Sequence, residues 1–497
     1  MSVADPTQFG LSRGDGLAPL RWRRAWLAID SSPKALAFAI SLPGLLLIHG
    51  AFVGTLLIGS QISLVATVMV MLTLAACAAF PLRRMAIMAS AGFLYICLRP
   101  FRSQQQTEFV ERLRMVTAET AELPALAFQV PMVLMFLAGS FVLLEAQRRL
   151  PASFFARRPV LCQIGAFAAA ILIGIALDAG TAAHAILWTQ VTILGASFFF
   201  LSYALADNRA KDDTPALQRL GFMRPFWSGP SVPFKGPAFL KKFEARTETE
   251  LAATRLRGLK LGLWAAILAL AHRLLSVAFY DAGAMPTLDE TIIAVAAGDL
   301  PGRGLSWAVV AKNFILNIIA FGAIAHTLVA IVRMAGYGIP RNMARPLTAR
   351  TMAEFWNRYV YYFKEVLVDF FFYPAFLRWF KKSPKLRIAF ATFCAAFVGN
   401  LLFSIIAQAH LFAQVGPIAA LATFQSYAVY AFALTLALIA SQLRSRPPRP
   451  EDGGLRYHVL PRVNVIGFFA LAQIFADESG VIGLADRSAF FLHLFGA

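Results

Sequence analysis

Charged residues are scarce in this sequence: Asp, Glu, Lys and Arg make up only 15% of its 497 residues, against 58% apolar residues. A soluble globular domain carries about 25% charged and about 45–50% apolar residues. The composition therefore excludes an ordinary soluble protein and predicts an integral membrane protein. Cysteine is also rare. Because Cys77, Cys97, Cys162 and Cys394 all lie inside apolar runs without metal-ligand spacing, we expect small buried side chains and neither disulfides nor a metal site.

Acidic residues are fewer than basic ones, 27 against 46, which gives a formal net charge of +19. The basic residues are placed in short loops between apolar runs, a pattern typical of cytoplasmic loops and not of nucleic-acid binding. The sequence also lacks a P-loop, a Gly-x-Ser-x-Gly elbow and a His-Glu-x-x-His motif, so it gives no signature of the corresponding nucleotide, serine-hydrolase or zinc chemistry.

Ten apolar runs predict an all-α, polytopic membrane protein. An eleventh or twelfth span is possible, since a weaker apolar run at 461–475 and a short apolar tail follow. The predicted spans are 36–59, 62–81, 85–98, 125–146, 159–177, 183–205, 259–280, 305–332, 387–410 and 416–441. The first run is expected to stay as a membrane anchor. With a cytoplasmic N-terminus every basic loop falls inside and the acidic 281–299 falls outside, which predicts a multi-pass protein of the cell inner membrane.

The order of spans and loops predicts five regions. They are a basic cytoplasmic tail (1–34), N-terminal spans (35–205), a cytoplasmic Pro-rich and basic loop (206–258), a core (259–441) and a C-terminal basic loop with apolar segments (442–497). The core contains the one long stretch, 333–374, that combines charge, aromatics, Pro and Gly. We therefore look for function there.

A helix is predicted from Thr351 to about Phe372, with Thr351 as N-cap and Glu354 three positions on, as in a capping box. Its apolar stripe is Phe355, Tyr359, Phe363, Val366 and Phe370, and its polar stripe is Arg358, Tyr362, Glu365 and Asp369. Two interpretations remain open. The helix is either an amphipathic helix at the membrane interface or a wall of a polar cavity, where charged groups inside membrane proteins usually mark function.

Four motifs in this stretch resemble those of the membrane-bound O-acyltransferases. The family pattern is Arg-Met-x-Gly, Pro-x-Asn, Phe-Trp-x-Arg-Trp-His and Asp-Tyr-x-Tyr-x-Pro. Here it reads Arg333-Met334-Ala335-Gly336, Pro340-Arg341-Asn342, Phe355-Trp356-Asn357-Arg358-Tyr359-Val360 and Asp369-Phe370-Phe371-Phe372-Tyr373-Pro374, at matching intervals. The resemblance implies a helical bundle with an interfacial helix. It also implies acyl transfer from an acyl-CoA or acyl-carrier thioester, with no bound cofactor, to an acceptor within the membrane.

The sequence departs from the family at its histidines. Val360 replaces the His of the helix motif, and Asn400 stands where the family has the His that acts as base in the next span. An asparagine amide donates and accepts hydrogen bonds but is no general base. Either the chemistry has moved, with His326 and His410 as candidate catalytic residues beside Asn400, or the fold serves a task without that step.

Candidate substrate-binding residues complete this prediction: they are Asn313, Asn317, Trp356, Arg358, Glu365 and Asp369. Asn313 and Asn317 lie one turn apart in the long span, where they either join two helices or line a substrate funnel. Three functions remain open. The first is acyl transfer to a cell-envelope polysaccharide or lipid. The second is a non-catalytic relative that binds or passes lipid or partners envelope-assembly proteins, and the third is a secondary transporter.

Overall fold

The computed structural model describes residues 26–59, 62–117, 119–210, 213–229, 235–444 and 454–496, and these form helices joined by loops. Most of the predicted basic tail (1–25), part of the Pro-rich loop (230–234) and the basic loop after Arg444 (445–453) lie outside the described residues.

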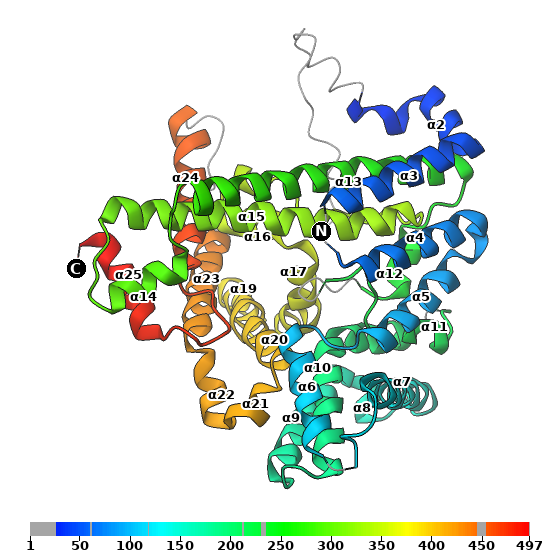
Figure 1. Ribbon diagram of the computed structural model, residues 1–497, viewed down its shortest axis with the longest axis horizontal. Coiled ribbons are helices and arrows are strands. Elements are labelled where there is room, and N and C mark those ends of the chain that lie inside the picture. Colours follow the sequence, from blue (N-terminus) through cyan, green and yellow to red (C-terminus); the bar gives the residue numbers. More distant parts are fainter. Residues whose placement is uncertain are drawn as a thin grey trace.

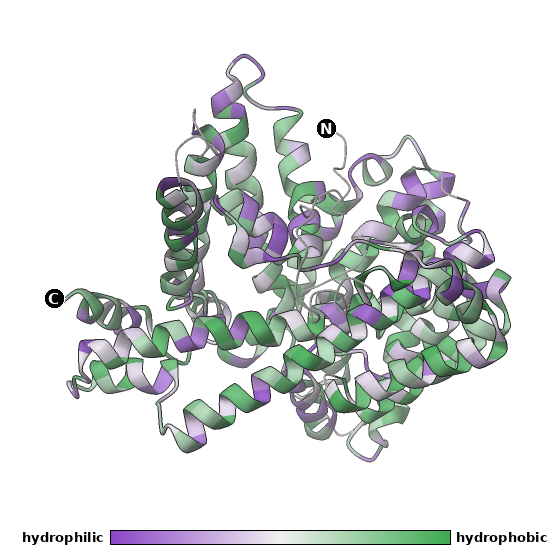
Figure 2. Cartoon of the chain, turned by 90° about the horizontal axis from the view of Figure 1, so that it is seen from above, coloured by the Kyte–Doolittle hydropathy of each residue, from purple (hydrophilic) through white to green (hydrophobic). Residues whose placement is uncertain are grey.

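Nine helices within the described ranges are long and apolar enough to cross a membrane. They are α3 (Leu42–Gly59), η2 with α5 (Pro81–Arg83, Arg84–Leu98), α7 (Ala125–Arg149), α9 (Pro159–Ala176), α10 (Ala182–Arg209), α13 with η3 (Glu248–Ser276, Val277–Ala282), α15 (Arg303–Met334), α19 with η6 and α20 (Pro384–Phe393, Cys394–Gly399, Asn400–Ala407), and α23 (Gln425–Leu443). Figure 2 shows hydrophobic residues along these long helices. The protein is therefore a multi-pass helical membrane protein.

Each of the ten predicted spans coincides with one of these nine helices or with α4 (Leu64–Ala79), a shorter apolar helix. The boundaries differ most at α13. It begins at Glu248, inside the segment predicted as a loop, because Thr247 and Glu250 form a capping box that starts the helix.

The shorter helices connect the spans and fill the gaps between them. They are α2 (Pro33–Ile40), α6 (Gln104–Val116), α8 (Phe154–Arg157), α11 (Ala216–Leu220), α12 (Pro237–Lys242), α14 (Leu288–Ala296), α16 (Met352–Tyr359), α17 (Tyr361–Leu367), α18 (Tyr373–Phe376), α21 (Leu411–Val415), α22 (Pro417–Thr423), α24 (Leu460–Ala472) and α25 (Leu484–Phe495), with η1 (Ile29–Ser31), η4 (Pro346–Thr348), η5 (Val368–Phe372) and η8 (Leu455–Val459).

Helices α13 and α15 lie side by side as the longest pair in the molecule (Figure 1). They are antiparallel: a Cβ at Gly258, near the start of α13, would lie 3.0 Å from the Met334 nitrogen at the end of α15. Small residues let the two backbones approach, as is usual for helices in membranes. The most apolar part of α15 is 67% buried, so this helix is central in the bundle.

Helix α10 is equally buried and forms a second centre, packed against α7, α9 and α20. A Cβ at Gly195 would lie only 2.6 Å from the Ile406 carbonyl oxygen, so α10 and α20 touch backbone to backbone. This contact brings the helix that carries Asn400 into the middle of the protein.

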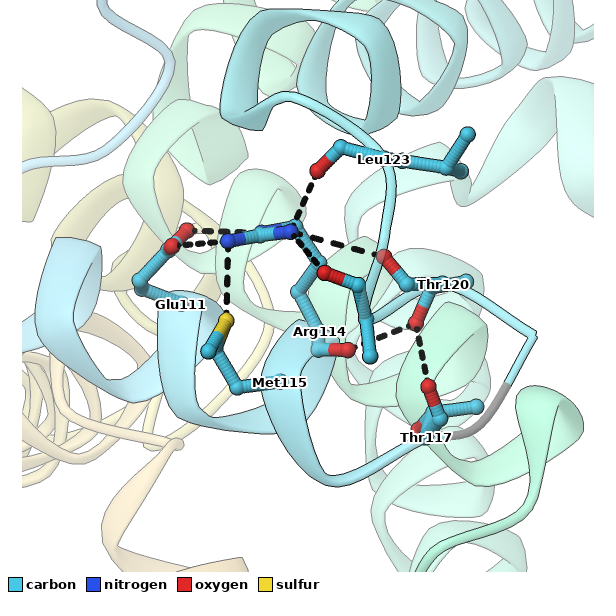
Figure 3. Close-up of polar contacts among 7 residues, drawn as sticks. Glu111, Arg114, Met115, Thr117, Thr120 and Leu123 are labelled. Carbon is cyan, nitrogen blue, oxygen red and sulfur yellow. Dashed lines mark hydrogen bonds and ion pairs between the residues drawn. The ribbon is translucent and has the colours of Figure 1, made fainter.

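The polar segment after α5, residues 99–124, is held by one arginine of α6 (Figure 3). Arg114 donates to the Ala121 carbonyl at 2.9 Å and to the Leu123 carbonyl, while its Nε donates to Glu111 Oε2 at 3.0 Å. Thr120 Oγ1 donates back to the Arg114 carbonyl at 2.8 Å. The hydrogen bond from Arg114 lowers the pKa of Glu111. Arg114 and Glu111 therefore hold the loop that follows α6 in place.

Candidate functional site

The central stretch begins by folding back on itself after α15. Arg333 donates from Nε and Nη2 to the Ile339 carbonyl, at 3.0 and 2.7 Å. Asn342 Oδ1 accepts from the Tyr362 backbone nitrogen at 3.0 Å, and the Tyr362 hydroxyl donates to the Pro340 carbonyl at 2.9 Å. The Arg-Met and Pro-x-Asn segments therefore build a turn that docks on α17.

The predicted single helix from Thr351 to Phe372 is wrong, because the chain breaks at Val360. Val360 ends α16 with φ −132° and ψ 59°, outside the helical region, and α17 and the π-helix η5 follow. The predicted N-cap is confirmed, since Thr351 Oγ1 accepts from the Glu354 nitrogen at 3.1 Å. The Glu354 carboxylate instead accepts from the Arg350 nitrogen at 2.7 Å.

Two of the predicted substrate-binding acids meet at a lysine from the Pro-rich loop. Lys235 Nζ lies 2.7 Å from Glu365 Oε2 and 2.8 Å from Asp369 Oδ2. Lys364 lies 2.6 Å from the other Glu365 oxygen, and the Tyr203 hydroxyl donates to Asp369 at 3.2 Å. We call Lys235, Glu365 and Asp369 the acid–lysine cluster.

Electrostatics favour the charged forms of Lys235 and Glu365. Burial lowers the pKa of Lys235, but the charges of Asp369 and Glu365 outweigh this effect and raise that pKa above its ordinary value. Burial raises the pKa of Glu365, but Lys364 and Lys235 outweigh it, so that pKa is lowered. The side chains of Lys235 and Glu365 are 20% and 18% exposed, so the pair is only partly screened by water.

Asn400 lies directly after the π-helix η6 and is fully buried. Its Oδ1 accepts a hydrogen bond from the Tyr427 hydroxyl of α23 at 2.8 Å, while its Nδ2 has no hydrogen-bond partner. Ser404, one turn on, donates to Glu478 Oε1 at 2.7 Å, and Gln408, another turn on, donates to Glu478 Oε2 at 3.0 Å. We call Asn400, Ser404, Gln408, Tyr427 and Glu478 the Asn400 group.

Two of the π-helices pack against each other: η5, which carries Asp369, and η6, which directly precedes Asn400. Such single π turns are found frequently at functional sites. The packing requires glycine at position 399, because a Cβ there would lie 2.7 Å from Cδ2 of the Phe371 ring.

An aromatic layer separates the acid–lysine cluster from the Asn400 group. The Phe199 ring stacks on Phe403 with centroids 5.2 Å apart, and Phe363 meets Phe403 edge-on at 4.8 Å. On the other side Phe370 packs 4.8 Å from the Tyr203 ring. The two polar groups are therefore distinct sites on either side of a packed core.

The two candidate histidines lie elsewhere. His326 is 5% exposed in α15 with an unpartnered Nδ1, and its charged neighbours are Arg333 and Arg341, not the Asn400 group. His410 follows α20 outside the spans, packs against Phe109 with ring centroids 5.8 Å apart, and has an unpartnered Nδ1. Burial, with a contribution from Arg112, lowers the pKa of His410 to about 4, so its imidazole is neutral at pH 7.

Asn313 and Asn317 both donate to Gln473 Oε1, at 2.9 and 3.4 Å. They therefore join α15 to the end of α24, as the helix-association interpretation expects.

Trp356 and Arg358 point to different surroundings on α16. The Trp356 ring packs edge-on against Phe363 at 6.2 Å. Arg358 pairs with Glu354 and donates to Thr348 Oγ1 at 2.5 Å.

The side chains of the acid–lysine cluster and the Asn400 group, with their partners, that the sequence did not indicate are Lys235, Tyr203, Tyr427, Ser404 and Glu478. Of these, Ser404 could have been predicted most easily from the sequence, because it lies four positions after Asn400 and therefore on the same helix face. The others come from distant segments, and only the fold brings them together.

No group of three or more His, Cys, Asp or Glu side chains within the described ranges could hold a metal ion. No protein-family model matches this chain. No curated protein matches it either.

Proposed function

We propose that this multi-pass membrane protein is an acyltransferase of the type its central stretch resembles. It moves an acyl group from an acyl-CoA or acyl-carrier thioester to a hydroxyl of a cell-envelope polysaccharide or lipid in the inner membrane. One observation carries the proposal: the buried Asn400 presents a free amide donor on the helix face where Ser404 binds the Glu478 carboxylate. A polar group of this kind inside a membrane protein is costly and usually functional.

The proposed roles follow from the chemistry of each group. Glu478 accepts the proton of the acceptor hydroxyl, because a carboxylate can act as general base where an amide cannot. The hydroxyl oxygen attacks the thioester carbonyl, the carbon–sulfur bond breaks, and the thiolate takes the proton from Glu478. Asn400 Nδ2 donates to the oxyanion that forms, which is worth about 3–4 kcal/mol for such a donor in other enzymes.

The hydrogen bonds of the Asn400 group fit these roles. Tyr427 holds Asn400 Oδ1 at 2.8 Å, which fixes the amide with its nitrogen free. Ser404 and Gln408 each donate to one oxygen of Glu478, at 2.7 and 3.0 Å, which orients the carboxylate. A base and a donor held by neighbouring side chains need no reorganisation during the reaction.

The test is lipid and polysaccharide profiling of a deletion strain, followed by complementation with variants. Loss of one acyl group on deletion, restored by the natural chain but not by Asn400→Ala or Glu478→Gln at equal membrane levels, is the expected result. His326→Ala and His410→Ala are the matched comparison. If either of these abolishes transfer while Glu478→Gln does not, the base is a histidine and our assignment is wrong. An unchanged profile on deletion refutes acyl transfer.

A second candidate is a non-catalytic relative that binds lipid, and a cavity favours it. The cavity of about 300 Å³ lies between α7, α9 and α10 and is lined mainly by apolar side chains such as Phe136, Leu194 and Leu201. Because these helices are membrane spans, an acyl chain is the fitting occupant. If the protein binds lipid in this cavity, replacing the lining residue Gly139 with Phe should reduce the amount of lipid that co-purifies. The same change should leave acyl transfer by the Asn400 group intact.

A further inference from the structure

Two buried arginines, one from α5 and one from α13, lie near each other. Arg84, the first residue of α5, and Arg255 of α13 are each 6% exposed. Arg84 Nη2 donates to the Ala245 carbonyl at 2.7 Å and to Glu244 Oε1 at 3.2 Å. Its Nε and Nη1 have no partner, and neither have Nε and Nη2 of Arg255.

The two guanidinium groups lie close enough to repel each other electrostatically. The Cys77 thiol is near enough to interact with both charges. Tyr337 belongs to the same place: Arg84 lies 5.7 Å from the centre of its ring, and the fully buried hydroxyl has no partner. His49 Nε2, near Arg255, is a fourth buried polar group without a partner.

The fold builds this place from helix ends. Residues 243–245 pair with residues 336–338 through hydrogen bonds of 3.0 Å (Ala245 nitrogen to Gly336 carbonyl) and 2.7 Å (Gly338 nitrogen to Phe243 carbonyl). Gly336 has φ +101°, and a Cβ there would collide with Arg84 Nη1, so only glycine allows the approach. The neighbouring helices α3, α4, α5 and α13 surround it (Figure 1).

Charge is not balanced in this arrangement. Among the described residues the two guanidinium groups have one carboxylate partner, Glu244, and it pairs with Arg84. A buried charge without a partner is strongly unfavourable, and so is a buried donor without an acceptor. The planar guanidinium fork matches the oxygens of a phosphate group, and two such forks with a tyrosine hydroxyl supply donors from several directions.

We propose that Arg84, Arg255 and Tyr337 form a binding site for a phosphate group. Arg84 begins α5 and Arg255 lies in the second turn of α13, so both are at the ends of spans, where phospholipid head groups lie. The phosphate belongs either to an anionic phospholipid or to a soluble phosphate-bearing ligand, which present the same oxygens. The site is independent of the acyl transfer proposed for the Asn400 group.

The experiment uses the purified full chain and has two arms. In detergent, thermal unfolding is followed with inorganic phosphate and with chloride at equal ionic strength. In nanodiscs of phosphatidylglycerol or of phosphatidylcholine, native mass spectrometry counts the lipid molecules that stay bound. Both arms compare the natural chain with Arg255→Gln and with Arg246→Gln, a matched loss of charge at an exposed arginine close in sequence.

Phosphate should raise the Tm of the natural chain and of Arg246→Gln by at least about 2 °C, and Arg255→Gln should lose this rise. That result supports a soluble ligand. Retention of phosphatidylglycerol that is lost only in Arg255→Gln supports a phospholipid. The proposal is overturned if the natural chain shows neither a rise in Tm with phosphate nor retained phosphatidylglycerol. It is also overturned if Arg255→Gln shows the same rise or the same retention as the natural chain. Where Arg255→Gln does not fold, Arg255→Lys keeps the charge, loses the fork and is judged by the same criterion.

Discussion

Replacing Lys235 with Met should destabilise the protein, because it removes a cation that contacts both acids of the acid–lysine cluster. Its Nζ lies 2.7 Å from Glu365 and 2.8 Å from Asp369. At an effective dielectric constant of about 20, each contact is worth about 6 kcal/mol before the cost of removing the charges from water. Breaking a fully buried pair costs about 3–5 kcal/mol.

Solvent reduces this cost. The Glu365 and Asp369 side chains are 18% and 28% exposed, and each keeps one other partner. We therefore expect Lys235→Met to cost about 2 kcal/mol in the free energy of unfolding, between the values for exposed and buried pairs. Methionine is one atom shorter than lysine and has no charge, so the change keeps most of the packing of the side-chain stem.

The assay is thermal unfolding of the detergent-purified chain, with Lys242→Met as control because Lys242 is exposed and lies on the same segment. A double-mutant cycle with Glu365→Gln isolates the pair: Glu365→Gln should cost less in the Lys235→Met background. The pKa of Glu365 is lowered in the folded protein, so this stability is present above pH ~4.3, the unfolded value, and is lost as the pH falls below it. Equal stability of Lys235→Met and Lys242→Met would refute the reasoning.

Three further changes test the site in the same unfolding assay. Gly399→Ala should cost about 1–3 kcal/mol, because its Cβ would lie 2.7 Å from the Phe371 ring; an unchanged Tm would show that the π-helices do not pack as described. Tyr427→Phe should cost about 1–3 kcal/mol by leaving Asn400 Oδ1 without its donor, and no loss would mean that water replaces the hydroxyl. Because the pKa of His410 is lowered to about 4, the natural chain should lose up to about 3 kcal/mol between pH ~6.5 and 4, where the unfolded state binds the extra proton. His410→Gln should flatten this part of the stability–pH curve, and an unchanged slope would contradict it.

The spans were predictable from the sequence because a membrane-crossing helix needs a long apolar run, which is a local property. The break at Val360 was not, since the stripe from Phe355 to Phe370 fits one continuous helix. The reason lies outside that stripe: the Asn342 carbonyl accepts from the Tyr361 nitrogen at 3.0 Å, and Asn342 Oδ1 from the Tyr362 nitrogen. Because these two backbone nitrogens donate to Asn342, they do not form the hydrogen bonds to preceding carbonyls that a continuous helix would need.

The partners of the candidate residues could not be predicted, because they come from far along the chain. Glu365 was identified as a polar helix residue, but its partner Lys235 lies 130 positions earlier in a Pro-rich loop. Asn400 was identified by alignment, while Glu478 lies in a short C-terminal loop with no motif of its own. Such contacts depend on how the spans pack, and an apolar run contains little information about its neighbours.

The two positions where the resembled family carries histidine have structural roles in this chain. Val360 is 9% exposed, ends a helix and packs in the same core as Phe363. Asn400 accepts a hydrogen bond from the Tyr427 hydroxyl, and this bond joins α20 to α23. Neither side chain can carry a proton at neutral pH. Glu478, whose oxygens accept hydrogen bonds from Ser404 and Gln408 on the same face of α20 as Asn400, is therefore the base in the acyl transfer that we propose.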